Sequence, residues 1–283
     1  MRRGFWLITT EHLENRLWFK DDEDFRAGMN YVAVLAVSLD VDVLAYNLMS
    51  NHVHFVTECT WKEAHSFINE FKRLYSQYYS KKYQSRELLR RNGIDIRPLD
   101  DPESVEKGIA YTLMNPVAAN ICITPSGYPW GSGACYFNLS AAKGTPAHMY
   151  SGRARIKMLH SKKPVPASLL FDENGCVIPS SFINVKLVES IFRSAKRMDY
   201  FLRSSSKARL EKGLPAFRDQ SILSVIPDLC KSIFRKNKLE ELTKEELGKL
   251  LKEIRYRFSS EPKQIARVTS LPYETVSSLL DSM

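Results

Sequence analysis

Two histidines placed two residues apart are the first candidates for chemistry in this chain. His52 and His54 lie in the run NHVHFVTE, where Val53 and Phe55 favour a strand. Alternate side chains of a strand point to opposite faces, so both imidazoles share one face and both apolar side chains take the other. Two imidazoles about 7 Å apart can converge on one divalent cation. The alternative is a pair of half-exposed histidines on a sheet face, which this spacing alone does not exclude.

A phenol and a carboxamide on a predicted helix form the second candidate group. In the segment IAYTLMNPVAANI, Tyr111 precedes Asn115 by four residues, so both side chains lie on one helix face. The sequence predicts a helix from Glu103 to Met114, with a stop at Asn115-Pro116 because the residue before proline is driven out of the α region. The simpler alternative is a core tyrosine followed by an asparagine cap.

The elements that would position these residues alternate between strand and helix. The histidine strand follows a β-branched and aromatic run across a short polar turn, which predicts a β-hairpin. The expected elements in chain order are a strand over 5–10, a helix that begins near the acidic cluster 21–24, two strands over 41–48 and from 52 joined by a turn at 49–51, and a helix over 62–83.

The helix over 62–83 also carries basic residues that could contact DNA. Its apolar residues recur at helical spacing, while Tyr75, Tyr79 and Tyr83 form a separate stripe. Cations neutralise phosphates and exposed rings stack on unpaired bases, although tyrosines that merely pack are an equal alternative. His65 on this helix is expected to be a surface or packing histidine. The candidates for phosphate contacts, here and just beyond, are Lys72, Arg73, Lys81, Lys82, Arg90 and Arg91.

The composition indicates a folded protein with a polyanionic partner. The chain has 283 residues, 44% hydrophobic residues and a formal net charge of +9. Its five cysteines are odd in number and lack CxxC spacing, which favours a reducing compartment over a disulfide framework or a zinc cluster. No signal segment and no apolar run of about 20 residues is present, so we expect a cytoplasmic protein without a membrane partner.

Several motifs together carry a family resemblance. The HVH strand after an MSN turn, the tyrosine one helical turn before Asn-Pro, a Pro-Val-Ala-Ala run and the closing segment 128–132 (YPWGS) occur in this order. Residues 1–140 thereby resemble the single-tyrosine (HUH, Y1) transposases of the IS200/IS605 type, in particular their REP-associated (RAYT) branch. Two departures are Ser50, where the family usually has proline, and the lack of a Gly-rich, Arg-containing segment before the tyrosine helix. The second departure leaves the mode of target recognition open.

The resemblance implies a fold, a cofactor and a reaction. The fold would be α+β, with an antiparallel sheet and helices on one face (a ferredoxin-like HUH domain). His52 and His54 would hold Mg²⁺ or Mn²⁺, and Tyr111 would attack single-stranded DNA beside a hairpin to form a 5′-phosphotyrosine. Asn115 is the expected third metal ligand, by resemblance and by its i+4 position. Glu58 is its rival because it shares the strand parity of the histidines.

The remainder of the chain is expected to form two further units. Residues 141–215 predict a linker or accessory region, with a small hairpin at an Asn-Gly turn and a helix over 182–202. Residues 216–283 predict a helical unit in which 243–258, 262–268 and 273–280 resemble a helix-turn-helix. The excess of Lys and Arg over Glu in 231–267 favours DNA contact, and a packing or dimer module is the alternative.

Three functions are compatible with these residues. The first is a metal-dependent DNA transesterase, a tyrosine transposase that acts as a monomer or homodimer. The second is a domesticated, catalytically silent regulator that binds hairpin DNA. The third, a zinc hydrolase, is disfavoured because no HExxH motif or third histidine at ligand spacing accompanies the pair.

Overall fold

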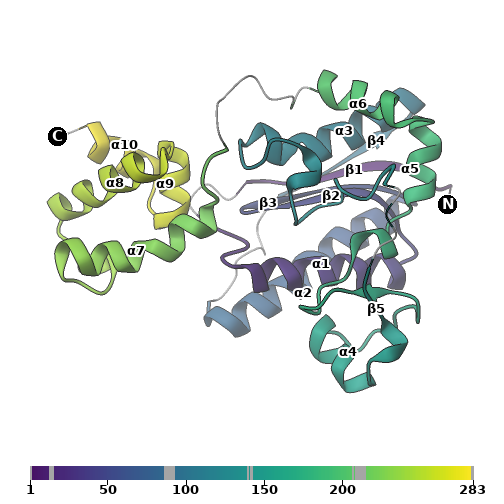
Figure 1. Ribbon diagram of the computed structural model, residues 1–283, viewed down its shortest axis with the longest axis horizontal. Coiled ribbons are helices and arrows are strands. Elements are labelled where there is room, and N and C mark those ends of the chain that lie inside the picture. The colour runs from purple at the N-terminus through teal and green to yellow at the C-terminus, as the bar shows by residue number, and fades with distance from the viewer. Residues whose placement is uncertain are drawn as a thin grey trace.

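An antiparallel sheet of four strands forms the centre of the N-terminal half (Figure 1). The computed structural model describes residues 2–12, 16–85, 93–138, 140, 143–205, 207 and 215–281. The strand order across the sheet is β2-β3-β1-β4, and every neighbouring pair is antiparallel. The strands are β1 (Gly4–Thr10), β2 (Asp42–Met49), β3 (His52–Cys59) and β4 (Ile94–Leu99). The predicted α+β class with an antiparallel sheet is confirmed.

Two helices cover one face of this sheet. Helix α1 (Asp22–Ser38) begins after Asp21, whose carboxylate accepts from the Asp24 amide, and α2 (Trp61–Tyr83) begins with a capping box at Thr60. Phe55 of β3 packs edge-on against Phe67 and Phe71 of α2, with ring centroids 5.2 and 5.6 Å away. The odd-numbered residues of β3 therefore face the core, as the strand parity predicts.

The opposite face of the sheet is covered as well. Helix α3 (Pro102–Ala118) lies across β2, β3 and β4, and α5 (Val185–Phe192) and α6 (Ala195–Ser204) lie against α3 (Figure 1). The even-numbered side chains of β3, which include both histidines, point toward α3. Helices on one face only were expected, and the second layer is what encloses the histidines.

Helix α3 does not end where the sequence predicts. The expected stop at Asn115-Pro116 is wrong, since the helix continues through Pro116 to Ala118. Proline has no amide hydrogen, so it leaves the carbonyl of Thr112 without its helical donor. Asn47 of β2 supplies the missing hydrogen bond, with Nδ2 2.6 Å from that carbonyl oxygen. A contact from outside the helix thus stabilises a conformation that the local sequence disfavours.

Strand β4 was not predicted. It is a six-residue edge strand whose Ile94 and Ile96 alternate with exposed Asp95 and Arg97. That alternation is typical of a half-buried strand, but a short strand containing proline gives a weak pattern.

The segment 143–205 packs against the N-terminal half. A small two-stranded sheet, β5 (Thr145–Pro146) with β6 (Leu170–Phe171), and helix α4 (Gly152–Leu159) lie beside α1. The hairpin at Asn174-Gly175 is present, with a bridge between Phe171 and Val177. The single helix expected over 182–202 is two helices, because Arg193 adopts a left-handed conformation (φ 63°) and ends α5.

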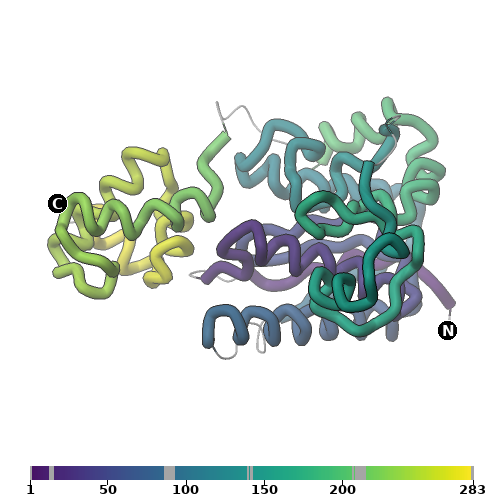
Figure 2. Tube along the Cα trace, turned by 60° about the horizontal axis from the view of Figure 1, so that its bottom comes forward, coloured from purple at the N-terminus to yellow at the C-terminus, as the bar shows by residue number. Residues whose placement is uncertain are grey.

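The four C-terminal helices have a hydrophobic core of their own. They are α7 (Asp219–Phe234), α8 (Lys244–Phe258), α9 (Pro262–Thr269) and α10 (Tyr273–Asp281), and they gather at one end of the molecule (Figure 2). The three predicted helices are present, and α7 was not predicted. Short 3-10 helices complete the assignment at Pro125–Gly127, Ala147–Met149, Pro179–Ser181 and Leu239–Glu241. Within the described ranges, no helix has the length and apolar character needed to cross a membrane.

Candidate active site

The structure brings His52, His54 and Tyr111 together on one face of the sheet. The two imidazole rings have centroids 4.8 Å apart at an interplanar angle of 82°. The His54 ring lies edge-on to the Tyr111 ring, with centroids 5.7 Å apart. Tyr111 is half-buried, so its ring contacts the imidazole without being enclosed in the core. The strand and the tyrosine helix therefore form a single site.

The orientation of His52 is fixed by its neighbour in the turn. Asn51 Oδ1 lies 2.8 Å from His52 Nδ1, and because a carbonyl oxygen only accepts, Nδ1 carries the proton and donates it. His52 Nε2 then keeps its lone pair, and this buried atom has no hydrogen-bond partner. Burial, followed by the charges of His54, His12, Lys207 and Arg267, holds the pKa of His52 well below its usual value. The ring is neutral, which is the form that binds metals.

His54 is more isolated still. It is 2% exposed, and neither ring nitrogen has a hydrogen-bond partner. Burial, with smaller effects of His12 and Lys207, lowers the pKa of His54 to about 3. Buried polar atoms nearly always have a partner, so these unpaired nitrogens indicate a place for a ligand. Together the two histidines offer neutral nitrogen donors that fit a divalent cation.

Oxygen ligands would have to come from another residue type or from the substrate. Among the described residues, no group of three or more His, Cys, Asp or Glu side chains is placed to hold a metal. Asn115 is buried on the same helix as Tyr111, and its Nδ2 donates to the Tyr111 carbonyl at 2.8 Å, which leaves Oδ1 as the atom that could face a cation. Glu58 lies four residues beyond His54, about 13 Å along the strand. The placement favours Asn115 over Glu58 as a third donor.

The YPWGS segment holds the hairpin next to the tyrosine helix. It follows the outer edge of β2, where the Leu48 amide donates to the Trp130 carbonyl and the Tyr128 hydroxyl donates to the Leu48 carbonyl. A Cβ atom on Gly131 would lie 1.8 Å from Asn47 Oδ1. Only glycine fits there, and Asn47 is the residue that donates to Thr112 of α3.

Three basic or imidazole side chains near the site were not predicted. The His12 ring stacks on His52 with centroids 3.6 Å apart, and Lys207 Nζ lies 5.1 Å from the centre of the Tyr111 ring. Arg267 of α9 lines a cavity of about 300 Å³ together with both His12 and His52. These residues come from the end of β1, from the segment after α6 and from the C-terminal helices, so no local sequence pattern joins them to the motifs.

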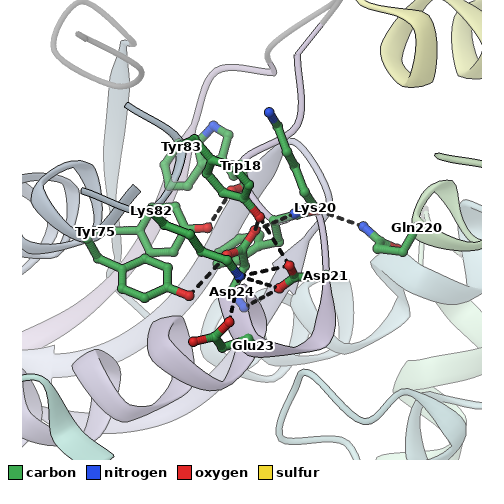
Figure 3. A network of polar contacts seen from close by, with 11 residues as sticks. Trp18, Lys20, Asp21, Glu23, Asp24, Tyr75, Lys82, Tyr83 and Gln220 are labelled. Atoms are coloured by element: carbon green, nitrogen blue, oxygen red, sulfur yellow. Dashed lines mark hydrogen bonds and ion pairs between the residues drawn. The ribbon is translucent and has the colours of Figure 1, made fainter. Parts of the chain in front are cut away.

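The basic side chains of α2 that were predicted to contact DNA differ in their exposure and in their ion pairs. Lys82 Nζ lies 2.8 Å from Asp21 and 2.9 Å from both Glu23 and Asp24, in a network at the start of α1 (Figure 3). Lys72 is buried and Arg73 is paired with Glu70, whereas Lys81 is exposed. Arg90 and Arg91 lie outside the described residues.

The tyrosine stripe of α2 is packed. Tyr75 is fully buried and donates to the Trp18 carbonyl, Tyr79 is 4% exposed, and the Tyr83 hydroxyl donates to Asp24 at 2.8 Å (Figure 3). The packing alternative therefore holds for Tyr75 and Tyr79, and these two rings are not available for stacking on bases. His65 is exposed, as expected.

The elements β1, α1, β2, β3, α2 and β4 follow one another in the order β-α-β-β-α-β, and the sheet carries a His-x-His strand with a tyrosine helix on the same face. This is the arrangement that the resemblance to single-tyrosine transposases implies. Residues 14–93 match the family described as Transposase IS200 like, which confirms the resemblance to this type over that part of the chain. The helix with Tyr111 lies outside the matched residues.

A comparison with solved structures finds a similar protein. A REP-associated tyrosine transposase bound to a REP hairpin is similar over 46% of this chain and 76% of its own, with 12% sequence identity and a TM-score of 0.38. None of the curated proteins compared with the chain is significantly similar to it in sequence.

Proposed function

We propose that this protein cuts and rejoins single-stranded DNA by transesterification, with Tyr111 as the nucleophile. The observation that carries the proposal is the contact between the Tyr111 ring and His54, 5.7 Å between centroids, beside buried imidazole nitrogens without partners. The family match over residues 14–93 and the net charge of +9 support a DNA substrate. The proposed strand lies beside a hairpin, as in the REP-associated branch that the motifs resemble.

The reaction exchanges one phosphate ester for another. The Tyr111 oxygen attacks phosphorus, the bond to the 3′ oxygen breaks, and the phenol proton ends on the released 3′-hydroxyl. The product is a 5′-phosphotyrosine that keeps the energy of the ester, so a second 3′-hydroxyl can reverse the step without ATP.

The residues around the phenol have separate tasks. His52, His54 and Asn115 would hold Mg²⁺ or Mn²⁺, which relieves charge on the phosphate and on the leaving oxygen. Lys207 over the Tyr111 ring adds positive charge where the phosphate would lie. Asn51 keeps Nδ1 of His52 protonated, which leaves the Nε2 lone pair free for a cation.

The test is the formation of a covalent complex. Wild-type protein, Tyr111→Phe and the control Tyr256→Phe are incubated with end-labelled single strands and Mn²⁺, and the products are separated under denaturing conditions. Tyr256 is 87% exposed on the distant helix α8. We expect an adduct with the wild type and the control but none with Tyr111→Phe, which should still bind DNA. Binding by the wild type without any adduct would favour the catalytically silent regulator.

A further inference from the structure

We propose that a second pocket beside Tyr111 binds one unpaired nucleobase next to the phosphate that Tyr111 attacks. This inference rests on the proposed function and adds the part of the substrate that the site recognises. The pocket has a volume of about 540 Å³, within the range of about 300–1,000 Å³ typical of small-ligand sites. Tyr111 lines this pocket, so the pocket and the candidate active site share that residue.

The walls of this base pocket suit the flat face of a base. Leu7 and Leu99 of the sheet, Ala110 of α3 and Phe201 of α6 contribute apolar surface. Tyr200 also lines the pocket and is 64% exposed, which leaves its ring available for stacking. Bases stack on aromatic side chains whatever their identity, because each base has a π-face.

Polar groups at the rim suit the edges of a base. Ser104 and Ser204 line the pocket, and Ser204 is exposed near the end of α6. Hydroxyl groups both donate and accept, so they can pair with the exocyclic groups of a base. The polar groups at the rim and the apolar walls inside match a nucleobase better than a phosphate, which would require cations in the interior.

An ion pair between α3 and α6, whose carboxylate is buried and whose arginine is about half exposed, holds the shape of the pocket. Glu106 of α3 is 2% exposed and receives two bonds from Arg197 of α6, at 2.5 and 2.7 Å. A bidentate pair fixes the angle between two groups as well as their distance, and it sets α6 against α3. Gly108 also lines the pocket, and a Cβ atom there would lie 2.8 Å from Leu99 Cδ1, so a larger residue would displace the Leu99 side chain that forms part of the wall.

The positive charge of Lys207 favours a phosphate at the side of the pocket where Tyr111 lies. Lys207 lies 5.1 Å from the Tyr111 ring, whereas Lys107 at the pocket is already paired with Glu103 at 2.7 Å. A nucleotide with its phosphate near Lys207 and Tyr111 would direct its base toward Tyr200. A base inside a duplex could not reach this pocket, which gives the site a physical reason to require a single strand.

The test measures binding of a base and does not depend on cleavage. The full chain carrying Tyr111→Phe is titrated with a short abasic strand that bears a single 2-aminopurine, whose fluorescence is quenched on stacking. The same strand without the base serves as the matched ligand. Two further variants alter the pocket: Tyr200→Ala removes the stacking wall, and Ser204→Trp blocks the mouth from an exposed position. Circular dichroism checks that each variant is folded.

We expect quenching with the parent protein, and about 5- to 150-fold weaker binding of the strand without the base, the range that base stacking on an aromatic side chain supplies. Both pocket variants should bind the two strands alike and quench little. Equal affinity of the parent protein for both strands would overturn the proposal, and so would quenching that survives in both variants. The pocket would then be better suited to bind an apolar side chain of a protein partner. The covalent adduct is measured separately, so a failure of the base pocket and a failure of the nucleophile are distinguishable.

Discussion

Buried nitrogen atoms without hydrogen bonds are costly, and His52 and His54 together have three of them. Leaving a buried polar group unsatisfied costs about 1–3 kcal/mol. A cation bound by one nitrogen of each ring would offset part of that cost, so a bound metal should stabilise the fold as well as assist the reaction.

The first prediction concerns metal binding. His54→Ala should weaken Mn²⁺ binding at least about 10-fold, since it removes one of two nitrogen donors. Titration calorimetry measures the affinity, and His65→Ala on the exposed side of α2 is the control. Unchanged Mn²⁺ affinity in His54→Ala would remove the histidine pair from the metal site.

The second prediction concerns pH. Burial lowers the pKa of His54 to about 3 in the folded, metal-free protein, whereas a histidine in the unfolded chain has a pKa of about 6.5. Below about pH 6.5 the unfolded chain therefore binds a proton at this residue that the folded protein does not bind. Stability from this group is complete above pH 6.5 and falls as the pH decreases, by about 2 kcal/mol at pH 5. Urea unfolding at pH 7.5 and pH 5, with chelator present, measures the loss. Between pH 7.5 and pH 5, His54→Asn should lose less stability than the control His65→Asn. Equal losses in the two variants would contradict a buried, neutral His54 ring.

At the scale of elements, the tyrosine helix depends on a hydrogen bond from a neighbouring strand. The carbonyl of Thr112 loses its helical donor at Pro116 and receives Asn47 Nδ2 instead. This bond holds α3 against β2, next to the strand that carries the histidines.

The third prediction uses this bond. Asn47→Ala should destabilise the protein by about 1–3 kcal/mol, because the buried Thr112 carbonyl loses its short hydrogen bond and keeps only the 3.4 Å contact with Asn115 Nδ2. Pro116→Ala restores an amide hydrogen at the correct position, so the double variant should lose less stability than the sum of the single changes. Chemical denaturation of the four proteins measures the cycle, and strict additivity would show that Asn47 does not replace the proline's missing donor.

The same contact shows why part of the fold could be predicted and part could not. The alternation of side chains along a strand depends only on neighbouring residues. The sequence alone therefore predicts that the imidazoles of His52 and His54 lie on one face of the sheet and that Val53 faces the core on the other. The end of α3 depends on Asn47, more than sixty residues away, and the rule for residues before proline failed there. His12 reaches the site only because β1 pairs beside β3, a long-range contact that no motif encodes.

At the scale of the whole molecule, Asp219 joins the C-terminal helices to the hairpin of β2 and β3 that carries the two histidines. It is the first residue of α7 and is 5% exposed. Ser50 of the hairpin turn donates to Asp219 at 2.6 Å, and Arg267 of α9 pairs with it at 3.0 Å. Serine at position 50, where the resemblance predicts proline, provides the hydroxyl for this bond. The predicted units 1–140 and 216–283 are therefore in contact near the site, and Lys207 of the predicted unit 141–215 lies over the Tyr111 ring. The boundaries of the three units stay predictions.

The fourth prediction concerns this junction. Asp219→Ala should weaken it by roughly 3 kcal/mol, since Arg267 loses its carboxylate in a mostly buried place. Hydrogen exchange should accelerate in α9 and in the hairpin turn at 49–51. Asp228→Ala, on an exposed face of the same helix, is the control. Exchange that is identical in the two variants would show that the C-terminal helices do not support the turn.

The proposed reaction attaches DNA to one particular atom, the phenol oxygen of Tyr111. Wild-type protein is incubated with single-stranded DNA and Mn²⁺, digested with protease and nuclease, and the peptides are sequenced by mass spectrometry. We predict that the remaining nucleotide is bound through phosphate to the Tyr111 oxygen. Attachment to any other side chain, or cleavage without attachment, would contradict a site built from Tyr111 and the two histidines.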